Sequence, residues 1–198
     1  MHETTSAPPS LSERKRLVVQ QRIVDAAHDL FSAQGFDNVS VTEIAARADV
    51  GRTTFFRYFG DKPEVVFTRE QEILDAVASF EVAGPAVTLA AAIEQLLPLV
   101  IDLFERVTAD ADAYFRHTAL LEQHLELRSR EALKMQQIAE RLSAVLERQG
   151  TPASIAALAG QVALACYLAA RRRAEHPGAL VGETRAAFDE VLRLGVTG

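Results

Sequence analysis

The sequence predicts an all-α protein of about nine helices, and three observations lead to this prediction. Apolar residues recur at helical spacing along most of the 198-residue chain, with few strand-like alternations. The numbers of glycine and proline residues are modest, at 10 and 7, and many of these residues stand where a helix is expected to begin or end. A hydrophobic content of 48% is enough to build a full core.

Composition and charge narrow the class further. Cys166 is the one cysteine, which excludes an internal disulfide and fits a reducing cytoplasm. Residues 1–12 are rich in Ser, Thr and Pro, show no signal peptide, and are expected to form a disordered arm. The formal net charge is −6, but a basic run at Arg14, Lys15, Arg16 and Arg22 precedes the more acidic remainder. This asymmetry fits a DNA-binding domain on a regulatory domain, and it fits a solvated helix start nearly as well.

The first helix is expected to be capped by Ser12 or a neighbouring residue and to run to about Gln34. Its apolar stripe has helical spacing, and its members are Ile23, Ala27, Leu30 and Phe31. Gly35 follows at the position of a left-handed helix stop, which lets Phe36 pack back on Phe31.

Two short helices are expected next, and together they form a helix-turn-helix. Ser40 and Glu43 have the S-x-x-E spacing of a capping box, which predicts a helix over residues 42–48. Asp49-Val50-Gly51 interrupts it, and a second helix is predicted over residues 52–58. Phe55 and Phe59 share the inward face of this second helix, because they stand four residues apart.

The outward side of residues 52–58 carries hydroxyls, a guanidinium and aromatic rings. Thr53 and Arg57 point away from the core, with Thr54 and Phe56 at the flanks. Such groups contact DNA phosphates, and arginine and the threonine methyl also contact base edges. An ordinary solvated surface helix explains the same pattern about as well, because short helices with one apolar face are common.

This N-terminal third resembles the DNA-binding domain of the tetracycline-repressor (TetR) family. The resemblance rests on residues 23–36, on Ser40-Val41-Thr42-Glu43-Ile44-Ala45, and on the run from Val50 to Phe59 followed by Lys62. It implies three DNA-binding helices and a larger helical ligand-binding domain, acting as a homodimer. It also implies the DNA-contacting residues, which are Thr42, Arg52, Thr53, Thr54, Phe56, Tyr58 and Lys62.

Four residues depart from the family pattern. Asp49 stands where the family usually has glycine, at a position expected to need a left-handed backbone, which Asp tolerates better than most residues. Gly51 replaces the usual serine and offers no hydroxyl to a phosphate. Phe56 replaces the usual tyrosine and Tyr58 the usual histidine, so Tyr58 is a candidate for supplying the hydroxyl that Phe56 lacks.

The rest of the chain is expected to form six more helices. Asp61, Pro63 and Glu64 predict the start of a fourth helix that reaches Val82. The others are predicted over residues 89–107, 110–125, 127–149, 152–175 and 182–194. The expected organisation is a disordered arm over residues 1–12, a helix-turn-helix DNA-binding domain over residues 13–60, and a ligand-binding and dimerisation domain over residues 61–198.

The predicted helix over residues 152–175 has an unusual composition. Residues 152–170 carry no charge and precede Arg171-Arg172-Arg173, so the stretch is formally a membrane-span candidate. It is dominated by alanine, however, and contains Gly160 and Gln161. We therefore expect no membrane partner, but a helix buried on most sides that is capped by Thr151 and suits a subunit interface. The resemblance likewise implies a dimer interface made by the last two helices.

The larger domain is expected to bind a small apolar effector. Inward-facing aromatic residues favour an apolar pocket with a few polar groups, and the resemblance places it between the fourth and eighth helices. The candidate ligand-binding residues are Phe80, Phe104, Tyr114, Phe115, His117, His124 and Tyr167. The stretch around Arg116, Arg128 and Arg130 is loosely similar to family members that bind acyl-coenzyme A, although solvated surface arginines are the better explanation.

No sequence pattern indicates an enzyme, a metal site or a cofactor. The chain lacks the G-x-S-x-G and glycine-rich phosphate motifs, and His117 and His124 have no accompanying ligand motif. The sequence therefore predicts a cytoplasmic, homodimeric transcriptional regulator, a repressor released from a palindromic double-stranded DNA operator by its effector. A helical ligand carrier or interaction domain without DNA binding is the alternative, and a helical enzyme ranks third.

Overall fold

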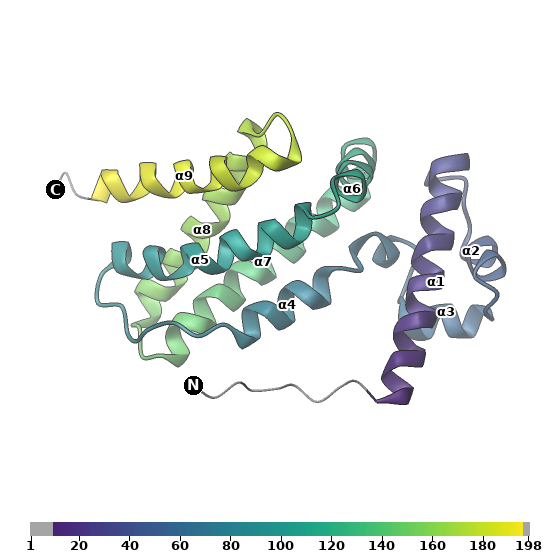
Figure 1. Cartoon of the computed structure of the whole chain (residues 1–198), viewed down its shortest axis with the longest axis horizontal. Helices are drawn as coiled ribbons and strands as arrows, with labels where there is room; N and C mark the ends of the chain where they lie inside the picture. Colours follow the sequence, from purple (N-terminus) through teal and green to yellow (C-terminus); the bar gives the residue numbers. More distant parts are fainter. Residues whose placement is uncertain (1–9, 196–198) are drawn as a thin grey trace. The chain divides into compact units, whose positions relative to one another are not determined.

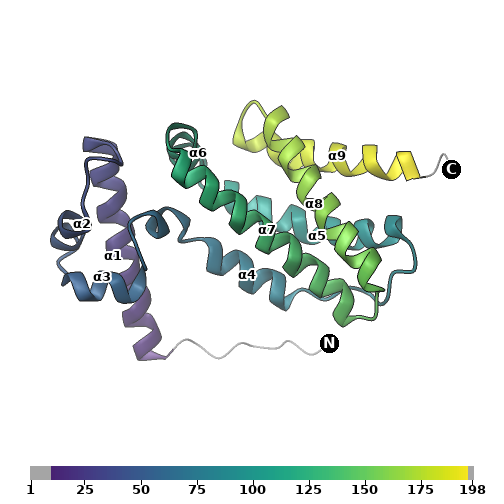
Figure 2. The ribbon, with the colours of Figure 1, turned by 180° about the vertical axis from the view of Figure 1, so that it is seen from behind.

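The computed structural model describes residues 10–195, and this part of the chain is helical and contains no strand. The chain divides into two compact units, residues 1–68 and residues 69–198 (Figures 1 and 2). Most of the predicted N-terminal arm, residues 1–9, lies outside the described residues. Leu11 and Ser12, the last two residues of that predicted arm, already belong to the first helix.

Three α-helices and a short 3-10 helix build the first unit. They are α1 (Leu11–Gln34), α2 (Val41–Arg47), α3 (Arg52–Tyr58) and η1 (Pro63–Phe67). Each α-helix contributes a fully buried side chain to one core, namely Ile23, Ile44 and Phe55. Gly35 ends α1 with a φ of +81°, and the ring centroids of Phe31 and Phe36 lie 5.0 Å apart. The predicted glycine stop and its aromatic contact are both present.

The prediction of one continuous helix over residues 61–82 is wrong. The segment forms η1 and then α4, which spans Glu70–Ser79. Val65, Val66 and Phe67 are all buried, and three consecutive residues cannot share one face of an α-helix, so the chain takes a tighter 3-10 course here. At the other end Phe80 adopts an extended backbone with φ −74° and ψ 135°, which terminates α4.

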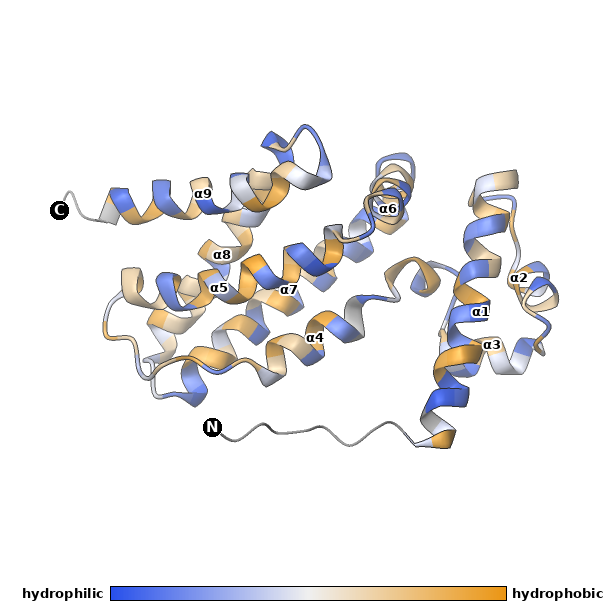
Figure 3. Cartoon of the chain, in the orientation of Figure 1, coloured by the Kyte–Doolittle hydropathy of each residue, from blue (hydrophilic) through white to orange (hydrophobic). Residues whose placement is uncertain are grey.

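The second unit contains six α-helices within the described residues. They are α4, α5 (Leu89–Thr108), α6 (Ala111–Gln123), α7 (Leu125–Arg148), α8 (Ala153–Arg173) and α9 (Leu180–Gly195), with a short η2 (Pro177–Ala179) before the last. Helix α8 is central, because it packs against α5, α7 and α9. In Figure 3 the visible turns of α8 are coloured mostly apolar, while α7 and α9 mix apolar and hydrophilic residues.

Helices α7 and α8 approach each other closely at Gly160. A Cβ built on Gly160 would lie 2.3 Å from Ser143 Oγ and 2.5 Å from the carbonyl oxygen of Ala139. Ser143 is itself buried and donates its hydroxyl hydrogen to Ala139 O at 3.0 Å. Glycine is therefore required at position 160 because the two helices lie too close together for a side chain, and not because of its backbone conformation.

The predicted Thr151 cap of α8 is also wrong. Pro152 occupies the capping position, while the buried hydroxyl of Thr151 accepts a hydrogen bond from Ala86 N–H at 2.9 Å. A buried N–H needs a partner, and this one lies in the segment that precedes α5. Thr151 therefore links the start of α8 to a segment 65 residues earlier in the chain.

Helix α8 is not buried on most sides of the single chain. An exposed stripe follows helical spacing along it, made of Ser154, Leu158, Gln161, Ala165 and Leu168. By length and composition alone α8 is apolar enough to cross a membrane, which is weak evidence for a helix that also forms the core of this unit. Ala163, in contrast, is buried inside the chain with 1% of its surface exposed.

Two ion pairs fix the carboxyl end of α8. Arg171 pairs with Glu131 of α7 at 2.6 Å, and Arg173 pairs with Glu190 of α9 at 3.0 Å. The two arginines come from the basic run that follows the apolar stretch. They attach α8 to two different neighbours.

Candidate nucleic-acid interface and effector site

The predicted capping box at the start of α2 is present. Ser40 Oγ accepts a hydrogen bond from the backbone N–H of Glu43 at 3.2 Å, and Glu43 Oε2 accepts one from the backbone N–H of Ser40 at 2.8 Å. The hydrogen bond from the Ser40 hydroxyl, and then that from its backbone, hold the pKa of Glu43 below its usual value. These bonds fix the entry into the helix-turn-helix.

The turn between α2 and α3 has the left-handed residue that the sequence predicts. Asp49 has a φ of +52°. Arg22 of α1 reaches this turn, because its Nη2 donates to the carbonyl oxygens of Ala48 and Asp49 and lies 3.3 Å from Asp49 Oδ2. An arginine of the basic run therefore ties α1 to the turn of the helix-turn-helix.

Helix α3 has the two sides that its sequence predicts. Phe55 and Phe59 are buried and their rings pack at 5.7 Å, while Gly51 provides the N-cap without a side-chain hydrogen bond. Of the predicted DNA-contacting residues, Thr42, Arg52, Thr53 and Phe56 are exposed, and Thr54 and Tyr58 are half-buried. The geometry thus brings these six predicted residues onto α2 and α3 outside the core.

Lys62 makes contacts within the first unit that the sequence did not predict. Its Nζ donates to the carbonyl oxygens of Phe36 at 2.8 Å and Val39 at 2.9 Å, and it lies 4.2 Å from the Phe36 ring centroid. These carbonyls belong to the turn between α1 and α2, which needs donors. Lys62 is therefore engaged in holding this turn with two of its three donors, and its contact with DNA stays a prediction.

One functional candidate was left out of the predicted DNA-contacting set. Arg57 is exposed at the end of α3, and its guanidinium carbon lies 5.5 Å from the ring centroid of Tyr58. Helical spacing already places Arg57 on the outward side, so the signal was available in the sequence. Arg14, Lys15 and Arg16 are likewise exposed on the first turns of α1.

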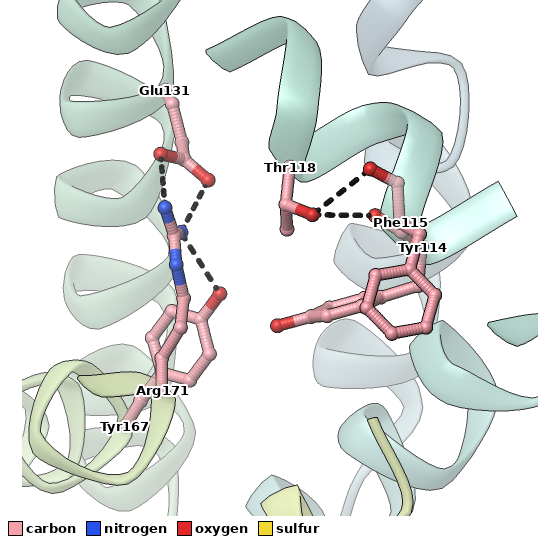
Figure 4. Close-up of polar contacts among 6 residues, drawn as sticks. All are labelled: Tyr114, Phe115, Thr118, Glu131, Tyr167 and Arg171. Atoms are coloured by element: carbon pink, nitrogen blue, oxygen red, sulfur yellow. Dashed lines mark hydrogen bonds and ion pairs between the residues drawn. The ribbon is translucent and has the colours of Figure 1, made fainter. Parts of the chain in front are cut away.

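In the second unit, three of the predicted ligand residues come together at one place. The rings of Phe104 on α5 and Tyr167 on α8 stack at 4.7 Å with an interplanar angle of 17°. Figure 4 shows Tyr114 of α6 pointing its hydroxyl towards Tyr167 and Arg171. Two charged residues that the sequence did not single out complete this group, Glu131 and Arg171, and we call the five residues the tyrosine cluster.

Burial sets the protonation of this cluster. Burial raises the pKa of Tyr114 to about 12, with a smaller contribution from Tyr167, and burial also raises the pKa of Tyr167. Burial alone would lower the pKa of Arg171, but its hydrogen bond to Glu131 and its contacts with Tyr167 raise it above the usual value. Both phenols therefore keep their protons, and the arginine keeps its charge.

The other predicted ligand residues lie elsewhere in the second unit. The prediction that Phe115 faces inward is wrong, because 52% of its side chain is exposed on α6. Phe80 packs against the core just after α4. His117 lies half-buried in α6, and His124 is half-buried at the junction of α6 and α7. The weak apolar pattern of α6 did not determine which aromatic residue points to the core.

A small three-helix unit whose second and third helices form a helix-turn-helix defines a class of DNA-binding proteins. Residues 23–67 match the family described as bacterial regulatory proteins, tetR family. The N-terminal unit is therefore similar to the DNA-binding domain of this family.

Two curated relatives show the extent of this similarity. The chain is 38% identical over 82 residues to the HTH-type transcriptional regulator TcmR of Streptomyces glaucescens, covering 40% of this chain and 36% of that protein. It is 36% identical over 67 residues to the HTH-type transcriptional regulator HbdR of Aromatoleum sp., and this match covers 34% of this chain and 28% of that protein. The chain thus spans about a third of the length of the curated relatives it matches, and these relatives are regulators.

Solved structures share the fold over most of the chain. SmeT, the repressor of the Stenotrophomonas maltophilia multidrug efflux pump SmeDEF, has a TM-score of 0.57 at 18% identity and covers 88% of this chain and 89% of its own. Thermus thermophilus FadR, a TetR-family repressor solved with lauroyl-CoA, has a TM-score of 0.51 at 24% identity. This match covers 87% of this chain and 92% of the FadR chain. At these identities the likeness establishes the all-α fold.

Proposed function

We propose that this chain is a homodimeric transcriptional repressor that binds a palindromic operator and is released by a small apolar ligand. The observation that carries the proposal is the helix-turn-helix, in which Arg52, Thr53 and Arg57 are exposed on α3 while Phe55 is buried. The match over residues 23–67 supports it. In this proposal the first unit binds DNA, and the second unit binds the ligand and forms the dimer.

The proposed DNA-contacting surface lies on α2 and α3. Hydroxyls and guanidinium groups position the protein on phosphates, and the arginines also reach base edges in the major groove. The proposed contacts are Thr42, Arg52, Thr53, Thr54, Phe56, Arg57 and Tyr58. Lys62 supports this surface through its bonds to the α1–α2 turn, and its own contact with DNA stays a prediction.

The proposed dimer forms through α8 and α9. Leu158 and Leu168 are 50% and 44% exposed on the outer stripe of α8, which is unusual for leucines on so apolar a helix. In the proposed dimer the two copies of α3 enter successive major grooves of the operator, which lie roughly 34–36 Å apart. Since α9 packs against α8, it borders the same interface.

The ligand is proposed to bind in the second unit near the tyrosine cluster. Two structural neighbours were solved with ligands that have an apolar part, SmeT with triclosan and Thermus thermophilus FadR with lauroyl-CoA, whose acyl chain is apolar. For this chain Arg116 and Arg128 are exposed on α6 and α7, where solvation explains them, so the acyl-coenzyme A option gains no support from their positions. Because the proposed site of action is DNA, the proposed location is the cytoplasm.

The deciding experiment selects bound duplexes from a random DNA pool with the full-length protein. We expect enrichment of a palindrome whose affinity falls with salt, because cationic side chains displace counterions from the phosphates. The Arg52→Ala, Arg57→Ala double variant should lose the selected duplex. Arg141→Ala, which removes an exposed arginine of α7, is the matched control and should leave the affinity unchanged.

If the wild-type protein enriches no sequence at low salt, the regulator proposal fails. The alternative of a helical ligand carrier or interaction domain then takes its place. Enrichment that the double variant retains would show instead that α3 does not enter the groove.

Dimerisation is tested separately by sedimentation. The Leu158→Glu, Leu168→Glu double variant should be a folded monomer, because it places charge in a packed interface. Leu133→Glu, at a leucine of α7 that is 69% exposed, is the matched control and should remain dimeric. Ala163 of the same helix is unsuitable for this test, because it is buried inside the chain and a charge at this core site would unfold the chain itself. A monomeric wild type at micromolar concentration would contradict the dimer.

A further inference from the structure

The starting point is the buried ion pair between α7 and α8. Arg171 Nη1 lies 2.6 Å from Glu131 Oε1, and Nη2 lies 3.3 Å from Oε2, so both carboxylate oxygens face the guanidinium. The side chains are 27% and 13% exposed, respectively. The pair is electrically neutral, and the charge of each member is already compensated by the other.

Two phenols adjoin this pair, and their donor capacity is not used within the described chain. Tyr167 Oη accepts a hydrogen bond from Arg171 Nη1 at 3.4 Å, so its own hydrogen must point away from the guanidinium. The Tyr114 hydroxyl makes no hydrogen bond to any residue in the part of the chain that the structure describes. Figure 4 shows it approaching Tyr167 and Arg171 from the opposite helix.

From this geometry we infer that the tyrosine cluster is the polar end of the effector site, and that it takes a neutral ligand through a carbonyl oxygen. The inference rests on the proposed function and specifies its ligand. A carbonyl oxygen has two lone pairs and accepts from two O–H donors at once, which matches Tyr114 and Tyr167. The ligand thereby satisfies donors that the protein leaves without an acceptor.

The negative charge of Glu131 disfavours an anionic ligand at this position. A carboxylate would approach Arg171 but would also meet Glu131, whose charge already neutralises that arginine. Burying a second negative charge next to the first is unfavourable unless it has its own counterion. A neutral acceptor needs no counterion.

The surroundings of the two phenols favour an apolar ligand body. The Tyr167 ring stacks on Phe104, and both rings border the apolar core of the second unit. A purely hydrocarbon ligand would bury the Tyr114 and Tyr167 hydroxyls without partners, which is costly in a low-dielectric site. The combined preference is for an aromatic or aliphatic body that carries one carbonyl group.

The test compares three probes with the same ring system: acetylnaphthalene, ethylnaphthalene and naphthoate, substituted at the same ring carbon. Their dissociation constants are measured by equilibrium dialysis on the full-length protein without DNA. Acetylnaphthalene should bind about two- to tenfold more tightly than ethylnaphthalene, the range of one or two neutral hydrogen bonds. Naphthoate should bind at least about tenfold more weakly than acetylnaphthalene.

Two variants assign the effect to named atoms. Tyr114→Phe removes one donor and should abolish most of the preference for acetylnaphthalene over ethylnaphthalene. Glu131→Gln leaves Arg171 without its counterion and should shift the preference towards naphthoate. Thr118→Val is the matched control, because its hydroxyl, one turn further along α6, already donates to the carbonyl oxygens of Tyr114 and Phe115 at 3.1 Å.

Equal binding of the three probes, tighter binding of naphthoate to the wild type, or no binding of acetylnaphthalene would each overturn the inference. So would a probe preference that Tyr114→Phe leaves unchanged. Because DNA is absent from this experiment, its outcome is independent of the duplex selection. A protein that prefers the carbonyl probe but selects no duplex would retain this site and lose the repressor function.

Discussion

The guanidinium of Arg22 and the carboxylate of Asp49 face each other at 3.3 Å across the turn of the helix-turn-helix. The same nitrogen of Arg22 also donates to the carbonyl oxygen of Ala48, which ends α2. Asp49 has the left-handed backbone that glycine adopts most easily. The aspartate that departs from the family pattern thus has a partner on α1.

The Arg22–Asp49 ion pair and the hydrogen bond from Arg22 to the Ala48 carbonyl should contribute differently to the free energy of unfolding. Asp49 is 98% exposed, so its ion pair is worth at most about 1 kcal/mol. Relief of the left-handed conformation in Asp49→Gly offsets a similar amount, so the free energy of unfolding should change by less than about 1 kcal/mol. Arg22→Ala should be less stable by about 1–2 kcal/mol, because it also removes the bond to the Ala48 carbonyl. Urea unfolding of both variants checks this, and equal losses would show that the ion pair dominates.

The capping box should make stability depend on pH. The folded pKa of Glu43 lies below its ordinary value, so its contribution is fully present above that ordinary value and is lost as the pH falls through the folded pKa. Glu43→Gln keeps a capping side chain that does not titrate. Its stability should match that of the wild type at neutral pH and exceed it at about pH 3. A difference between the two proteins that is constant across this range would contradict the assignment.

Gly160 offers a direct test of the α7–α8 contact. Gly160→Ala places a methyl group 2.3 Å from Ser143 Oγ and 2.5 Å from the Ala139 carbonyl oxygen, so the helices must separate. The expected loss of unfolding free energy is about 1–3 kcal/mol. The control is Gly182→Ala in α9, where nothing lies within 4 Å and alanine should stabilise the helix by about 0.5–1 kcal/mol. Two variants of equal stability would show that α7 and α8 are not closely packed.

Alkaline titration reports on the surroundings of Tyr114. Burial raises the pKa of Tyr114 to about 12, because the phenolate is poorly solvated there. The ultraviolet difference between wild type and Tyr114→Phe should therefore show a phenolate transition near pH 12. The associated stability is present below the ordinary value of 10.0 and lost as the pH rises through the folded pKa. A transition near 10.0 would place Tyr114 in water.

Local patterns in the sequence predicted the first unit well, and the reason is distance along the chain. The Gly35 stop and the Ser40–Glu43 capping box involve residues within five positions of each other, so their geometry follows from helix periodicity. Asp49 was placed in the left-handed region through the family resemblance, because the family usually has glycine at this position. The α3 helix was predicted with its observed bounds.

The contacts that the sequence did not predict involve partners that are distant in sequence. Lys62 bonds to carbonyls up to 26 residues earlier, and Thr151 bonds to Ala86, 65 residues away. Arg171 and Glu131 are 40 residues apart, so neither was singled out before the fold was known. Spacing rules describe one helix at a time, whereas these contacts depend on which helices become neighbours.

The two arginines at the end of α8 constrain which insertions and deletions this helix can accept during evolution. Arg171 and Arg173 are two residues apart, which separates them by about 200° around the helix, and each engages a different neighbour. Losing or gaining one residue between Gly160 and Arg171 would turn both arginines by about 100° relative to the glycine contact and break both ion pairs together. The number of residues in α8 between Gly160 and Arg173 is therefore fixed by its contacts with α7 and α9.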